Sequence, residues 1–176
     1  MADCETLEGI EIGCDGNVGG IKKFYAALRS EVTFPLTLSS PGDEISTITM
    51  IGGATFQEFE FTKNTSTFQE TEDTNQENGT AFTLQTITLK LNRREKTKRD
   101  KLLLLGKFKD LVVIITDNNN INWFFGEENG VNLKTKDGGA GTNKGDANGY
   151  TLTFIGEEPV EANTVTDAAL AAVIYV

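Results

Sequence analysis

The side chains with the clearest potential for chemistry are carboxylates, because the chain contains no histidine. Without histidine it lacks the commonest general base, the commonest transition-metal ligand and every Ser–His or Cys–His nucleophile pair. Glu58 and Glu60 are two residues apart, a spacing that places both carboxylates on one face of a strand. Nothing in the sequence gives these two groups the different surroundings that an acid/base pair requires. We therefore expect no catalytic residue and no enzymatic activity.

The glycine-rich segment 137–149 invites two further interpretations, a phosphate loop and a calcium loop. Residues 138–145 lack the Gly-Lys-Ser/Thr sequence of a phosphate-binding loop, and no helix is expected to follow them. Asp137, Asp146 and Asn148 carry oxygen atoms of the kind that calcium prefers, but their spacing does not match an EF-hand loop. We expect a flexible loop, with no bound metal and no cofactor.

Length and composition are typical of one soluble globular domain. The chain has 176 residues, 38% of them apolar, and no apolar run approaches the roughly 20 residues that span a bilayer. We expect one domain over residues 1–176, with short N-terminal and C-terminal extensions and no membrane partner. The N-terminal segment has no signal-peptide pattern, which predicts cytoplasmic synthesis. Cys4 and Cys14 are then expected to be free thiols.

Charge is distributed unevenly along the chain. Residues 90–109 contain nine basic and two acidic side chains, whereas the rest contains seven basic and 24 acidic ones. The net charge of the whole chain is -10. A helix is predicted over residues 93–105, since straight-chain helix formers dominate there and Gly106 follows. Its exposed cations, which cost self-repulsion when crowded together, form a predicted assembly interface: Arg93, Arg94, Lys96, Lys98, Arg99 and Lys101. A solvated helix face is the alternative.

The rest of the chain has the pattern of strands. Twenty-three threonines and eleven phenylalanines favour half-buried strands. Residues 21–28, 46–51, 54–62, 111–116, 121–126, 131–134 and 150–155 are the clearest predicted strands, joined by a polar hairpin over 63–79. Along residues 82–91 the apolar alternation slips between Leu84 and Ile87, which indicates a β-bulge. The predicted fold is mainly β, a β-sandwich or partly open barrel with one flanking α-helix.

The second half of the chain resembles a known family. The sequence LVVIITDNNNINWFFG at residues 111–126 is followed by Glu-Asn-Gly at 128–130, a glycine-rich loop, and Gly-Asp, Asn-Gly-Tyr-Thr-Leu-Thr-Phe and Gly-Glu-Glu up to residue 158. This order is similar to that of the major tail tube proteins of tailed bacteriophages, most closely over residues 111–158. The resemblance implies a small β-sandwich that forms oligomeric rings. Six copies close into each ring, the rings stack into a tube, and DNA passes through the lumen.

Acidic strand faces fit such a tube, because carboxylates repel the phosphates of passing DNA. The predicted lumen face consists of Glu58, Glu60, Glu70 and Glu72. Residues 63–79 are predicted to be an arm that is mobile in the monomer and is ordered by a neighbouring subunit, with Phe68 as its anchor and part of the assembly interface. The resemblance implies a virion protein made in the host bacterial cytoplasm, with itself and other tail proteins as partners.

Two alternatives remain open. The nearer one is another phage structural β-protein, such as a tail completion, head–tail connector or capsid decoration protein. The farther one is a monomeric module that binds glycan or calcium in the loops at 117–122 and 137–149.

Overall fold

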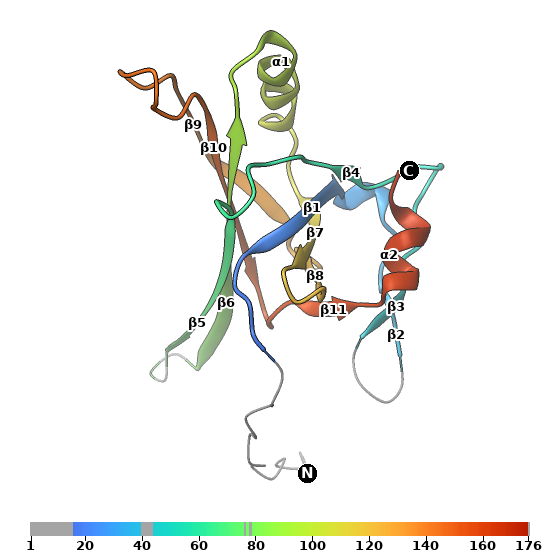
Figure 1. The fold of residues 1–176 in the computed structure, drawn as a ribbon. Coiled ribbons are helices and arrows are strands. Elements are labelled where there is room, and N and C mark those ends of the chain that lie inside the picture. The colour runs from blue at the N-terminus through green and yellow to red at the C-terminus, as the bar shows by residue number, and fades with distance from the viewer. Residues whose placement is uncertain (1–15, 40–43, 76, 78, 176) are drawn as a thin grey trace, which may run out of the picture.

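The protein forms one continuous, strongly curved β-sheet with two helices (Figure 1). The computed structural model describes residues 16–39, 44–75, 77 and 79–175. The main path of the sheet runs in the order β2-β3-β11-β8-β7-β9-β10-β6-β5, and β1 pairs with β7 and β4 beside this path. The sheet curls into an open half-barrel, so the prediction of a mainly β, partly open barrel with a flanking helix is confirmed.

The elements have the following bounds in chain order. The strands are β1 (Ile21–Leu28), β2 (Thr37–Leu38), β3 (Ile45–Thr47), β4 (Gln57–Glu58), β5 (Thr67–Asn75), β6 (Thr80–Asn92), β7 (Leu111–Asp117), β8 (Asn122–Phe125), β9 (Val131–Gly139), β10 (Gly149–Glu158) and β11 (Asn163–Val165). The helices are α1 (Lys96–Leu105) and α2 (Asp167–Val173), and a short 3-10 helix spans Arg29–Glu31.

Strand β7 lies between two apolar clusters, which explains why every one of its residues is buried. Its odd-numbered residues, such as Val113, join a cluster that β6 and β10 close from the opposite side. Across this cluster the rings of Phe24 and Phe154 have centroids 5.5 Å apart. Its even-numbered residues, such as Ile114, join a second cluster that α2 helps to cover. The continuous apolar run therefore results from burial on both faces.

The predicted bulge in β6 is absent. The register of β6 is regular against both neighbours from Thr83 to Thr88. The slip in the apolar alternation arises because a polar residue, Gln85, occupies an inward position with 1% exposure. Its side chain accepts a hydrogen bond from Gly126 N (3.2 Å) and donates one to Glu70 Oε1 (3.1 Å). These partners make the polar group tolerable in the core.

Several predicted boundaries were also wrong. The strands expected at 46–51 and 54–62 reduce to the short β3 and β4 around a turn in which Gly52 and Gly53 both have positive φ. Strand β9 continues to Gly139, since its exposed outer half still pairs with β10. The glycine-rich loop is correspondingly shorter than predicted. A second helix, α2, replaces the expected mixed tail, because the side chain of Thr166 caps it by accepting a hydrogen bond from Ala169 N.

Candidate assembly surfaces

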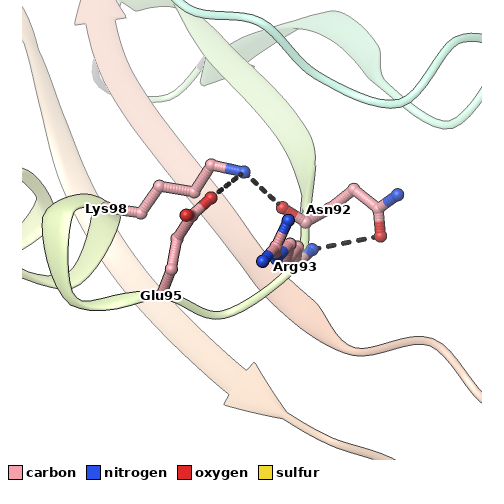
Figure 2. Close-up of polar contacts among 4 residues, drawn as sticks. All are labelled: Asn92, Arg93, Glu95 and Lys98. Carbon is pink, nitrogen blue, oxygen red and sulfur yellow. Dashed lines mark hydrogen bonds and ion pairs between the residues drawn. The ribbon is translucent and has the colours of Figure 1, made fainter.

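Helix α1 is positioned by a tight turn at the end of β6. Arg93 has φ 60°, a left-handed conformation that reverses the chain outside the helix. Its backbone N–H donates to Asn148 O and Asn92 Oδ1, and Lys98 Nζ donates to Asn92 O (2.6 Å) while pairing with Glu95 (3.3 Å) (Figure 2). The helix begins three residues later than predicted, because these contacts hold residues 93–95 in the turn.

The six predicted interface cations divide into two groups. Lys98 is used by the turn, and the Arg94 guanidinium lies 5.4 Å from the centroid of the buried Tyr150 ring, in a cation–π contact. These two side chains therefore support the fold of their own chain. The side chains of the other four, Arg93, Lys96, Arg99 and Lys101, are exposed. Arg99 approaches only its neighbour Asp100, at 3.9 Å with both side chains more than half exposed, which contributes little to stability.

The exposed side of α1 and the segment just after it also carry large apolar side chains. Leu103, Leu104 and Phe108 are 45%, 53% and 38% exposed, whereas Leu102 and Leu105 face the core. We call the exposed set of Arg99, Lys101, Leu103, Leu104 and Phe108 the helix patch. A groove of about 360 Å³, lined mainly by apolar residues of β1 and by Phe59, Leu105 and Phe108, adjoins it. The helix face is thus both cationic and apolar, which a solvated face does not require.

The four carboxylates of the predicted lumen face do not form one surface. Glu58 and Glu60 line a hollow together with Lys22 and Lys23, so their charge is partly balanced locally. Strand β4 pairs with β1, whereas β5, which carries the other two carboxylates, pairs with β6 at the far end of the sheet. Within one subunit the four predicted lumen carboxylates therefore lie on separate parts of the sheet.

Glu70 is half-buried and is hydrogen-bonded within its own subunit. Its Oε1 accepts hydrogen bonds from Ala162 N (2.8 Å) and from Gln85 Nε2 (3.1 Å). Burial raises the pKa of Glu70, and the two hydrogen bonds oppose this rise only in part. Glu72, two residues along β5, is exposed. Of this pair, only Glu72 remains available to line a channel.

Phe68 also packs inside its own chain, which corrects its predicted role as an intersubunit anchor. Its ring centroid lies 5.3 Å from that of Phe125 and 6.2 Å from that of Trp123. Strand β5 pairs with β6 along its whole length, from Thr67 to Asn75. No neighbouring subunit is needed to form these pairs, so the proposed arm is part of the subunit's own sheet.

A buried carboxylate that the sequence reasoning missed holds the turn between β8 and β9. Glu158 is 3% exposed and accepts hydrogen bonds from Glu128 N, Asn129 N and Gly130 N at 2.9, 2.9 and 3.2 Å. Gly130 has φ 79°, and a Cβ there would lie 2.8 Å from Asp110 Cα. The Glu-Asn-Gly and Gly-Glu-Glu sequences of the family resemblance therefore meet in this turn. Strand alternation was the available signal, since Glu158 shares the inward parity of Gly156.

The residues on either side of Glu158 form a second exposed surface, which carries both acidic and apolar side chains. Glu157, Val160 and Glu161 are exposed, Val160 by 62%. We call these three residues the acidic corner. Residues 145–176 contain no lysine or arginine. The acidic corner therefore has an apolar centre flanked by carboxylates, the complement in charge of the helix patch.

The two loops proposed for glycan or calcium binding lie apart (Figure 1), at the β7–β8 turn and at the tip of the β9–β10 hairpin. Asp117 accepts hydrogen bonds from Asn119 N and Ile121 N at 2.8 and 2.9 Å. Asp146 accepts from Thr142 N and Asn143 N, both at 2.7 Å, and these bonds lower its pKa. Each carboxylate thus stabilises its own turn.

Other site classes find little support in the described part of the chain. Residues 16–39, 44–75, 77 and 79–175 contain no group of three or more His, Cys, Asp or Glu side chains placed to hold a metal ion. Within the same residues, neither helix has the length and apolar character needed to cross a membrane. Cys4 and Cys14 lie outside the described residues. No family model, curated protein or solved structure matches this chain.

Proposed function

We propose that this protein is a structural subunit without a catalytic role, that it assembles with copies of itself into stacked rings, and that the rings form the tail tube of a bacteriophage. The family resemblance over residues 111–158 supports the tail tube assignment and six subunits per ring. The protein is then made in the cytoplasm of the host bacterium, becomes part of the virion, and contacts other tail proteins. DNA is a passenger in the lumen.

The observation that carries this proposal is the separation of opposite charges along one strand pair. Gly149 of β10 pairs with Asn92 of β6, beside the cationic helix α1. The ten residues of β10 extend about 30 Å from there to Glu158 at the acidic corner. Figure 1 shows α1 at one end of the molecule and the paired ends of β5 and β6, Asn75 and Thr80, toward the other. Two unlike ends favour head-to-tail contacts, which extend into stacks.

The shape of the sheet supports assembly within a ring. Strand β5 is nine residues long and lies at the end of the sheet order, with β6 as its one partner in the described chain. An open edge of this length presents unpaired backbone N–H and C=O groups that another chain can use. The outer half of β5, with Glu72 and Asp73, is exposed and acidic. These charges disfavour non-specific pairing of this edge with strands of other proteins.

The net charge of -10 supports the passage of DNA without adhesion. Adhesion to DNA needs cations that displace counterions from phosphate. Nine of the 16 cations of this chain lie in residues 90–109, on and around α1, where contact between copies would cover those on the helix patch.

The test is light scattering combined with negative-stain microscopy of the purified full-length protein. We expect rings or tubes that weaken between about 0.1 M and about 1 M salt, as the screening length falls from about 10 Å to about 3 Å. Assembled protein is expected to retain no double-stranded DNA at low salt. A protein that stays monomeric at every concentration would overturn the proposal, and calcium binding by that monomer would favour the binding-module alternative. Single rings that never stack would favour a connector or decoration protein.

A further inference from the structure

We infer that the acidic corner of one subunit docks on the helix patch of a second copy, with Val160 against Leu103 and Leu104 and the carboxylates of Glu157 and Glu161 facing Arg99 and Lys101. This inference rests on the proposed function in that it assigns the contact through which copies stack. It differs from the contact within a ring, which the proposed function assigns to the open edge of β5.

The helix patch has the features of a surface that is covered in the working assembly. Positions 99 and 103 are four residues apart on α1, and positions 101 and 104 are three apart, so each leucine lies beside a cation. Leu103 and Leu104 are both close to half exposed, although Leu102 and Leu105 already supply the contacts of α1 with the core. The helix therefore presents more apolar area than its own fold uses.

The acidic corner has the matching features. Val160 is among the most exposed large apolar side chains of the described chain, at 62%. It lies between Glu157 and Glu161 and follows Pro159, whose ring restricts the backbone there. The side chain of Glu158 is buried in the neighbouring turn. The corner thus presents one exposed apolar group with a carboxylate on either side of it along the chain.

A second copy is the partner that fits these surfaces, because the two surfaces are complementary and belong to the same chain. Neither surface covers the other within one subunit, since both remain exposed. In Figure 1, α1 projects at the top of the molecule, while the connection from β10 to β11 lies in its lower half. A contact between unlike surfaces at opposite ends cannot close between two copies. It repeats from copy to copy along the β10 direction.

The decisive experiment is a charge exchange across this contact. The helix reversal carries Arg99→Glu and Lys101→Glu, and the corner reversal carries Glu157→Lys and Glu161→Lys. Each reversal places like charges opposite one another, so we expect the protein concentration needed for stacking to rise by about tenfold or more. The combined fourfold variant restores attraction and is expected to stack within about threefold of wild type. Circular dichroism must show a folded monomer in every case.

The matched controls carry the same charge changes elsewhere. Lys136→Glu with Lys144→Glu alters two exposed lysines of the β9–β10 hairpin and is expected to leave stacking unchanged. Glu58→Lys with Glu60→Lys, added to the helix reversal, supplies the same compensating charge away from the acidic corner and is expected to restore nothing. Equal rescue by Glu58 and Glu60 would show that only net charge matters and would overturn the inference.

A second measurement tests proximity. In a background lacking Cys4 and Cys14, Val160→Cys and Leu104→Cys proteins are mixed and treated with a short bismaleimide. We expect crosslinked pairs in the mixture and none with either protein alone. Tubes that form normally from both reversal variants, without these crosslinks, would refute this contact while leaving the proposed function standing. Crosslinked pairs formed by protein that assembles into linear chains without rings would keep the contact and refute the tube.

Discussion

Glu158 offers the sharpest test of how this sequence fixes its fold. Its Oε1 accepts hydrogen bonds from Asn129 N and Gly130 N, and its Oε2 accepts one from Glu128 N. In Glu158→Gln one oxygen becomes an amide nitrogen, which cannot accept a hydrogen bond. With the remaining oxygen at the position of Oε1, the amide N–H₂ faces the Glu128 N–H, donor against donor. The substitution is nearly isosteric, so it changes hydrogen bonding and charge with little change in packing.

The expected cost follows from these three bonds. A hydrogen bond to a charged group contributes about 1.5–3 kcal/mol, against about 0.5–1.5 kcal/mol for a neutral one. Two bonds lose their charge assistance and the third is lost, although water reaches the exposed residue Glu128 and offsets part of that loss. We expect Glu158→Gln to lower the free energy of unfolding by about 3 kcal/mol. At this chain length that corresponds to a fall in Tm of roughly 6–12 °C.

The assay is urea unfolding of dilute protein in high salt, followed by circular dichroism, with the midpoint compared at constant m-value. Glu157→Gln is the matched control, because it makes the same chemical change at the adjacent exposed position. The control is expected to stay within about 0.5 kcal/mol of wild type. If Glu158→Gln behaves like Glu157→Gln, the buried carboxylate does not hold the β8–β9 turn and the reasoning fails.

Three further predictions concern the interior of the subunit. Burial raises the pKa of Glu70 above its ordinary value of 4.5, so wild type gains stability as the pH falls from neutral towards 4.5 and this carboxylate is protonated. In Glu70→Gln the single amide oxygen can still accept both hydrogen bonds. This variant should be more stable than wild type at pH 7 in thermal melts, and its advantage should shrink towards pH 4. Phe68→Ala should destabilise the monomer by about 2–3 kcal/mol in urea, whereas an intersubunit anchor would leave monomer stability unchanged. Gly149→Ala should destabilise the folded subunit strongly, because its Cβ would lie 2.0 Å from Leu91 O. Gly139→Ala on the paired strand, whose Cβ would have nothing within 4 Å, should not. Equal urea midpoints for these two variants would contradict the close approach of β6 and β10.

The parts of the fold that the sequence predicted well are those in which side-chain burial determines the pattern. Strand β7 and the hairpin to β8 were predicted nearly to the residue, because burial on both faces demands an unbroken apolar run. The same reasoning failed at Gln85, because a polar residue occupies an inward position there. Its side chain is hydrogen-bonded to residues distant in the sequence. Those partners are 41 and 15 residues away, and no local pattern reveals them.

Other errors have different physical causes. Helix α2 had a local signal, a threonine cap followed by Asp167 and an alanine-rich turn, which a reading based on apolar alternation passed over. Strand β3 pairs with β2 and, at one position, with β11, and β4 pairs with β1 at only two positions, so the sequence pattern overestimated the length of both. For the candidate surfaces, the sequence located the cations of α1 but could not show that Arg94 and Lys98 serve their own chain.

The acidic corner depends on the register of β10, which links the assembly surface to the core. Gly156 and Glu158 face inward while Glu157 faces outward, and β10 keeps a regular register with β6 over ten paired positions. A slip of one residue would bury Glu157 and expose Glu158, removing the acceptor of three backbone N–H groups and changing the projection that carries Val160. The exposure of Glu157 is therefore enforced by the burial of its neighbour. A substitution at Glu158 should weaken stacking even though that side chain touches no second copy, because it loosens the turn on which the acidic corner rests.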